Sequence, residues 1–189
     1  IFPLFIGLAA VSKNFTLVLL GEKWLPMVVS LAILSISYLI SSLTSPIVSM
    51  NSALGYIKQQ ALVRLVAVIF LILGLLKFSH YGIEAASYTL LAFYILLFVL
   101  SFIILRQKLQ IGLGAITKSF LPSCIASLVM YIGVELVQTQ ILQSSPVLNL
   151  LTAIAVGIVT YAVCVLLLPF PQWGFLRQRA IKAVRAKVG

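Results

Sequence analysis

The sequence predicts an all-α protein, a polytopic transmembrane helix bundle of about six spans, from three observations. Charged residues are scarce, with 13 basic and 3 acidic side chains among 189 residues. Apolar residues make up 62% of the chain, and its mean hydropathy is +1.21. The charges are also clustered, because residues 24–57 and 85–105 carry none and residues 119–176 carry only Glu135. A bilayer core selects uncharged apolar runs of about 18–20 residues or more.

Short polar segments divide the chain into predicted spans, each long enough to cross about 30 Å of hydrocarbon. We place the spans at residues 2–20, 25–49, 61–78, 85–105, 119–142 and 147–168. The cluster Gly21-Glu22-Lys23-Trp24 ends the first span. The second span is entered through Pro26, which the first turn of a helix tolerates, and a polar loop at residues 50–60 follows it.

The third span is the least apolar, because it contains Arg64 and Lys77 near its two ends. We expect both side chains to snorkel, so that their charged groups lie at the membrane interfaces. The fourth span carries no charge. The fifth and sixth are separated only by Gln143-Ser144-Ser145-Pro146, residues that favour a turn. We therefore treat residues 1–168 as one transmembrane unit of six spans.

Residues 169–189 form a basic tail that follows the last span. An apolar stripe at Leu176, Ala180, Val184 and Val188 opposes basic residues at helical spacing. This pattern is typical of a helix on anionic lipid headgroups, and we interpret the tail as a cytoplasmic topology anchor. The alternative is a regulatory or partner-binding tail.

The basic residues fall unequally on the two sides of the predicted topology. One side receives ten: Lys58, Arg64, Arg106, Lys108, Lys118, Arg177, Arg179, Lys182, Arg185 and Lys187. The other side receives two, Lys23 and Lys77, and Lys13 lies within a span. Because short cytoplasmic loops are enriched in Lys and Arg, both ends of this multi-pass chain are predicted to be cytoplasmic.

Several classes of function are disfavoured by the composition. The net charge of +10 is spread over loops between apolar spans, so it does not form the solvated basic face that binds nucleic acid. Cys124 and Cys164 lie in apolar runs without ligand neighbours, and the one histidine, His80, lies in a short external turn. We predict no metal, no cofactor and no enzymatic activity.

Polar side chains inside the predicted spans are the candidate functional residues, because ionisable groups in hydrocarbon are costly. Lys13 and Asn14 lie mid-span in the first predicted helix and could bind an anionic substrate in an aqueous cavity. Alternatively, Lys13 pairs with a structural counter-ion or lies at the interface. Glu135 in the fifth span is a candidate for ion coupling, or is satisfied by a neighbouring helix.

The second span carries many hydroxyl groups. They are Ser30, Ser35, Ser37, Ser41, Ser42, Thr44, Ser45 and Ser49. Small polar residues allow close helix packing, which is the simpler interpretation. The alternative is that this span forms the wall of a cavity that holds water or sugar.

The sequence resembles a known transporter family. The segments Gly7-Leu8-Ala9-Ala10-Val11, Leu19-Leu20-Gly21-Glu22-Lys23-Trp24-Leu25-Pro26, Ser45-Pro46 and Ala53-Leu54-Gly55 are similar to the C-terminal half of Wzx-type polysaccharide and lipopolysaccharide flippases. These flippases belong to the MATE-like MOP superfamily. The resemblance is strongest over residues 1–106. Because the sequence starts at Ile1 without a methionine, we expect it to start partway through a longer protein.

The resemblance implies a fold and a function. It implies the second lobe of a two-lobed transporter in the bacterial inner membrane, which moves an undecaprenyl-diphosphate-linked oligosaccharide to the outer leaflet by alternating access. Lys13, Asn14 and Arg64 would then contribute to a cationic cavity. The expected partners are membrane lipids, the lipid-linked oligosaccharide, the N-terminal half and the polysaccharide polymerase machinery.

Two alternatives stay open on the sequence. A MATE-like exporter of small cations would share the fold and need acidic residues in its cavity, for which Glu135 is the candidate. A membrane scaffold for polysaccharide synthesis would not transport anything itself.

Overall fold

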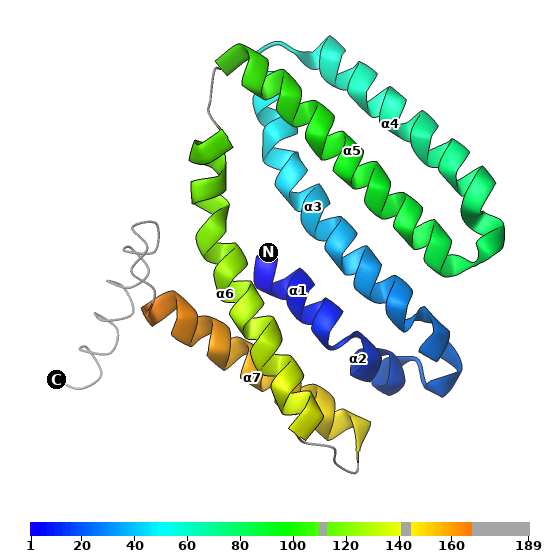
Figure 1. The fold of residues 1–189 in the computed structure, drawn as a ribbon, viewed down its shortest axis with the longest axis vertical. Helices are drawn as coiled ribbons and strands as arrows, with labels where there is room; N and C mark the ends of the chain where they lie inside the picture. Colours follow the sequence, from blue (N-terminus) through cyan, green and yellow to red (C-terminus); the bar gives the residue numbers. More distant parts are fainter. Residues whose placement is uncertain (110–112, 141–144, 168–189) are drawn as a thin grey trace.

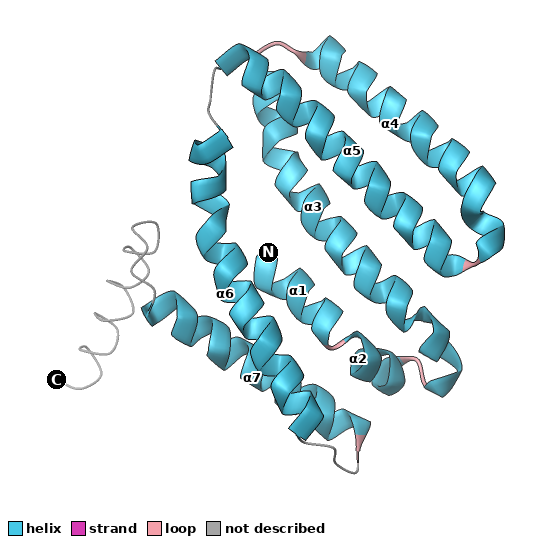
Figure 2. Cartoon of the chain, viewed as in Figure 1, coloured by secondary structure: helices cyan, strands magenta, loops and turns pink. Residues whose placement is uncertain are grey.

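The computed structural model describes residues 1–109, 113–140 and 145–167, and all regular elements in this part of the chain are helical (Figure 1, Figure 2). The elements are α1 (Phe2–Ala10), α2 (Ser12–Leu19), η1 (Glu22–Met27), α3 (Val28–Ala53), α4 (Ile57–Phe78), η2 (Ser79–Tyr81), α5 (Ile83–Leu109), α6 (Leu113–Gln140) and α7 (Pro146–Leu167). Helices α6, α1, α3, α5 and α4 lie side by side in that order, and α7 packs against α6 (Figure 1).

The predicted multi-pass helical architecture is confirmed in its main outline. Five described helical segments are long and apolar enough to cross a membrane, and α1 with α2 makes a sixth if the bent pair forms one span. The predicted span at residues 147–168 corresponds to α7 (Pro146–Leu167). The basic tail predicted at residues 169–189 lies outside the described residues.

Two sequence-based predictions about helix boundaries are wrong. The first predicted span is not one continuous helix, because α1 and α2 meet at Val11 with a bend of 71°. The predicted loop at residues 50–60 shrinks to residues 54–56, where Gly55 adopts a φ of +86° that favours glycine. The remaining loop residues belong to α3 and α4, and two of them, Asn51 and Gln60, bond to each other between the helices.

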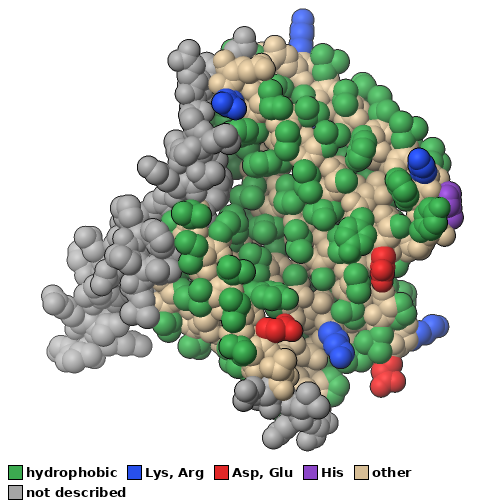
Figure 3. Space-filling view, viewed as in Figure 1, with side chains coloured by type: hydrophobic (Ala, Val, Ile, Leu, Met, Phe, Trp, Pro, Cys, Tyr) green, Lys and Arg blue, Asp and Glu red, His purple; other side chains and the backbone are tan. Residues whose placement is uncertain are grey.

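The surface of the described chain is strongly apolar, with the charged side chains toward the ends of the helices (Figure 3). Helix α4 is the extreme case, because only 6% of its apolar window is buried. Large exposed apolar surfaces are unfavourable in water. They are compatible with hydrocarbon, which supports a multi-pass membrane protein.

Three helices are joined at one end of the bundle by a buried polar network. The Asn51 side-chain amide donates hydrogen bonds to Gln60 Oε1 at 3.0 Å and to the Ser101 carbonyl at 2.9 Å. Gln60 Nε2 donates to Ser101 Oγ at 2.9 Å. Asn51 and Ser101 are fully buried. The network ties α3, α4 and α5 together where neither water nor lipid can replace these bonds.

Helices α4 and α5 approach each other closely at Gly74. A Cβ atom added there would lie 2.5 Å from Thr89 Cγ2. The Thr89 hydroxyl donates to the Ala85 carbonyl at 2.9 Å, so its methyl group faces the glycine. Small residues at such positions set the distance between transmembrane helices, because packing rather than hydrophobicity holds helices together in lipid.

The variant Gly74→Ala should lower the free energy of unfolding by about 1–3 kcal/mol through overpacking, although Ala is the better helix former. Adding Thr89→Ser removes the clashing methyl group, keeps the hydroxyl and should restore stability. Unfolding in mixed micelles followed by circular dichroism measures both. The matched control is Gly133→Ala, whose Cβ would lie 3.4 Å from Thr160 Oγ1. Equal losses for the two glycine variants would contradict the close contact.

The variant Asn51→Ala should cost about 1–3 kcal/mol, because it leaves the Gln60 and Ser101 acceptors buried without their donor. The same unfolding assay applies, with Ser49→Ala as the control. Ser49 is exposed on the same helix, and its hydroxyl donates only to the Ser45 carbonyl. If the two variants are equally stable, the network does not hold these helices together.

Candidate functional site

The break between α1 and α2 is the most unusual backbone feature of the described chain. Sharp helix kinks usually occur at proline, at glycine or serine pairs, or where a side chain inserts into the hydrogen-bond ladder. Neither glycine nor proline occupies Val11 or its two neighbours, Ala10 and Ser12. Glycine and proline at the junction therefore do not account for the 71° bend, which directs attention to contacts from other helices.

Gln138 of α6 provides these contacts. Its side-chain nitrogen donates to the Ala10 carbonyl at 3.3 Å, at the end of α1. Its side-chain oxygen accepts a hydrogen bond from Asn14 Nδ2 at 3.3 Å, at the start of α2. Carbonyls at a helix end need such partners, because the helix itself provides none. The Gln138 amide thus bonds to both sides of the break.

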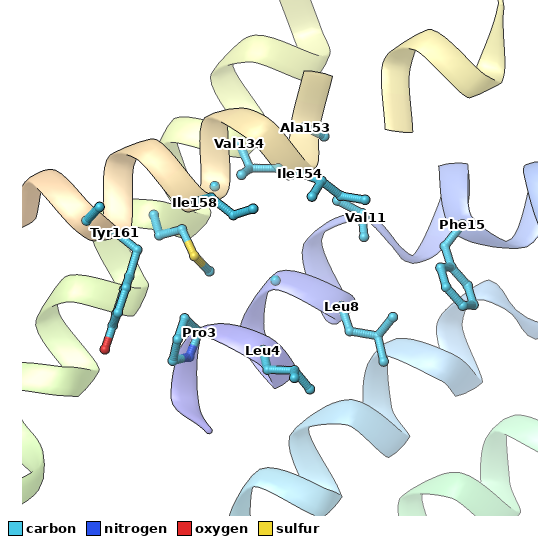
Figure 4. Close-up of a pocket in the computed structure, with 14 residues that line it drawn as sticks. Pro3, Leu4, Leu8, Val11, Phe15, Val134, Ala153, Ile154, Ile158 and Tyr161 are labelled. Carbon is cyan, nitrogen blue, oxygen red and sulfur yellow. The ribbon is translucent and has the colours of Figure 1, made fainter. Parts of the chain in front are cut away.

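An open, almost wholly apolar groove of about 610 Å³ lies beside the break. Side chains of α1, α6 and α7 surround it, and they point toward a common space (Figure 4). Gly7 and Gly157 widen it, because a Cβ at either position would contact Met130 or Val134. Val11 and Phe15 line the end nearest α2. The groove can accept an apolar chain but offers few polar contacts.

Of the four predicted site residues, the structure joins Asn14 to α6 through Gln138, and Lys13 and Glu135 lie within one turn of these two residues. Lys13 is exposed in the first turn of α2, two residues from each of the groove residues Val11 and Phe15, and so lies on the opposite side of that turn and does not itself line the groove. Asn14 is half-buried in its bond to Gln138. Glu135 is exposed on α6, three residues before Gln138 and hence on the same side of the helix. No ion pair with a described residue involves Lys13 or Glu135.

Lys13 and Asn14 also lie nearer to one end of the bundle than their mid-span position in the predicted helix implied. The bend shortens the path of α1 and α2 along the bundle, and Gln138 belongs to the last turn of α6. Arg64 is exposed on α4, one turn after Gln60. It therefore lies near the C-terminal end of α3, whereas α2 lies near the N-terminal end of α3. The structure therefore does not bring Arg64 together with Lys13.

Sequence reasoning missed Gln138. The available signal was an amide side chain in an apolar helix, three residues after Glu135. The hydroxyl groups of α3 have mixed roles. Ser37 and Thr44 are buried and donate to carbonyls one turn earlier at 2.8 Å, which fits the packing interpretation. His80 is exposed in the η2 turn, as predicted.

Comparison with protein-family models, curated proteins and solved structures finds no match to this chain. Among the residues that the structure describes, no group of three or more His, Cys, Asp or Glu side chains could hold a metal ion. The helices and their apolar surfaces define the class, a multi-pass helical membrane protein. The family resemblance stays a prediction.

The variant Gln138→Leu should lower the stability of the bend by about 1 kcal/mol, the usual worth of such hydrogen bonds. Hydrogen exchange in detergent micelles should then increase at the backbone amides of residues 11–15. Thr139→Ala is the control, because Thr139 is exposed and its hydroxyl donates only to the Leu136 carbonyl. Unchanged exchange in Gln138→Leu would mean that the bend has another cause.

Proposed function

We propose that this chain is half of a flippase that moves a lipid-linked oligosaccharide across the bacterial inner membrane by alternating access. Its product would supply exopolysaccharide or lipopolysaccharide biosynthesis. The observation that carries the proposal is an apolar groove whose end adjoins a helix break bearing Lys13. An undecaprenyl diphosphate has the matching chemistry, a long apolar chain that ends in an anionic group.

The groove alone gives this substrate little affinity. Lipid tails are as apolar as the groove, so moving a polyprenyl chain from the bilayer into the groove gains packing but almost no hydrophobic energy. The groove therefore selects by shape. Affinity has to come from the headgroup, and charge-assisted hydrogen bonds contribute about 1.5–3 kcal/mol each.

Lys13 is the described cation nearest in sequence to the groove residues, and we assign the headgroup contact to it. It lies in the first turn of α2, where the helix dipole also favours an anion. Discontinuous helices whose free N-termini bind anionic groups are common at transporter substrate sites. Asn14, whose amide already bonds to Gln138, would hold the first turn in place.

The proposed orientation gives Arg64 a separate role. With both chain ends in the cytoplasm, the α3–α4 turn faces the cytoplasm and the α2 end faces outward. Arg64 would then attract the diphosphate at the cytoplasmic mouth, and Lys13 would bind it near the outer leaflet. The N-terminal half of the protein would supply the facing wall of the cavity. Neither step requires a cofactor or covalent chemistry.

The variant Lys13→Ala should reduce flipping of lipid-linked oligosaccharide about tenfold or more, because one charge-assisted contact is lost. The assay reconstitutes the intact protein in vesicles and follows transfer of a fluorescent substrate to the opposite leaflet. Lys23→Ala is the matched control, because Lys23 is an exposed lysine in η1 and not in the first turn of α2. Equal rates for Lys13→Ala and the parent protein would remove Lys13 from the site.

A small-cation exporter predicts a different result in the same vesicles. Glu135→Gln would then abolish efflux of a fluorescent cation, and the parent protein would not move the lipid-linked oligosaccharide. That pair of outcomes would replace the proposed function by the alternative.

A further inference from the structure

The middle helix of the array, α3, has two free faces of opposite character. It packs laterally against α1 on one side and α5 on the other, as Figure 1 shows. One free face exposes Tyr38, Ser45 and Ser49. Ser45 and Ser49 lie 7 and 11 residues after Tyr38, so the three residues lie close to one line along the helix. The other free face exposes apolar side chains, including Ile36 and Met50.

The polar face lies deep within the predicted hydrocarbon layer. Tyr38 and Ser45 are within about 7 Å of the midpoint of α3, whereas hydrocarbon extends about 15 Å from the centre of the bilayer. Neither hydroxyl group has a hydrogen-bond partner among the described residues. Lipid tails cannot satisfy these groups. The Ser45 hydroxyl can turn to a carbonyl of its own helix, as the Ser49 hydroxyl does. The Tyr38 hydroxyl extends beyond its own helix turn, so it needs a hydrogen-bonding partner outside α3, and lipid does not supply one.

Aromatic rings from the neighbouring helices extend this face on both sides. The Phe5 ring of α1 lies 6.4 Å from the Tyr38 ring, with planes 15° apart. The Tyr94 ring of α5 lies 5.9 Å from Tyr38 on the other side. At these separations the rings are offset neighbours and not face-to-face pairs. Together they form an aromatic row across three helices, and Tyr38 at its centre is 48% exposed.

We propose that Tyr38, with Phe5, Tyr94 and Ser45, forms a platform that binds the sugar residues of a carbohydrate ligand. Sugar rings present C–H groups that pack on aromatic faces and hydroxyl groups that bond to Tyr and Ser. A partner helix would need a complementary polar row, and a lipid would leave the hydroxyl groups unsatisfied. The assignment of this carbohydrate to a transported lipid-linked oligosaccharide rests on the proposed function, whereas the platform itself does not.

Binding of a soluble sugar tests the platform directly. Saturation-transfer NMR on the intact protein in micelles, with cellopentaose and chitopentaose as probes, should show weak binding. Tyr38→Ala should raise the Kd roughly fivefold to tenfold, the effect of one aromatic contact. Ser45→Ala should raise it about twofold to fivefold, through the loss of one hydrogen bond. Ile36→Ala is the matched control on the opposite face of the same helix, with an exposure of 43%.

Three outcomes would overturn the platform. The first is that neither sugar shows a saturation-transfer signal with the parent protein. The second is that Tyr38→Ala and Ile36→Ala change the Kd equally, and the third is that Ser45→Ala leaves the Kd unchanged. The last result decides the matter if Tyr38→Ala fails to fold, because the exposed Ser45 hydroxyl supports no described contact.

The vesicle assay separates this proposal from the proposed function. Sugar binding that depends on Tyr38, in a protein that flips no lipid-linked oligosaccharide, would keep the platform and refute transport. Flipping at the parent rate in both Tyr38→Ala and Ser45→Ala would keep transport and refute the assignment of the platform's carbohydrate to the transported substrate.

Discussion

The arrangement of the helices depends on one constraint, that polar groups between membrane helices must be hydrogen-bonded inside the protein. Hydrocarbon offers no partner, and an unsatisfied buried amide costs several kcal/mol, roughly the stability that one such network adds. Asn51, Gln60 and Ser101 meet most of this constraint by bonding to one another across three helices, and only the Asn51 Oδ1 atom of this network is buried without a partner among the described residues. Because these groups can be satisfied only in this arrangement, they fix the relative positions of α3, α4 and α5. Apolar packing alone would leave the register of these helices free to slide.

The same constraint accounts for the bend in the first span. A break in a membrane helix releases carbonyl groups that have to be bonded elsewhere, and Gln138 bonds to the one at Ala10. A contact from α6 therefore bonds to both sides of the bend, and Asn14 is held against Gln138 near a groove formed by α1, α6 and α7. The described functional candidates depend in this way on a contact between residues more than 120 positions apart.

Much of the fold could be predicted from the sequence, because its main signal is local. Hydropathy over about 20 residues identifies helices that cross a bilayer, since every backbone group in lipid must bond within its own helix. The predicted spans matched α3 to α7 within a few residues at most boundaries. The loop at residues 50–60 was the exception. Asn51 and Gln60 look like loop residues in a local window, and only their shared partner on α5 allows both to stay helical.

The class of this protein, the approximate position of each helix and the scarcity of charge can be read from the sequence, since these follow from composition within single segments. The tertiary structure alone decided which polar residues meet. It separated Arg64 from Lys13, placed Glu135 and Gln138 beside the helix break, and left Tyr38 exposed between Phe5 and Tyr94. The physical reason is that helix formation in lipid is a property of each segment. The face that a helix presents to a neighbour depends instead on pairwise contacts between distant parts of the chain.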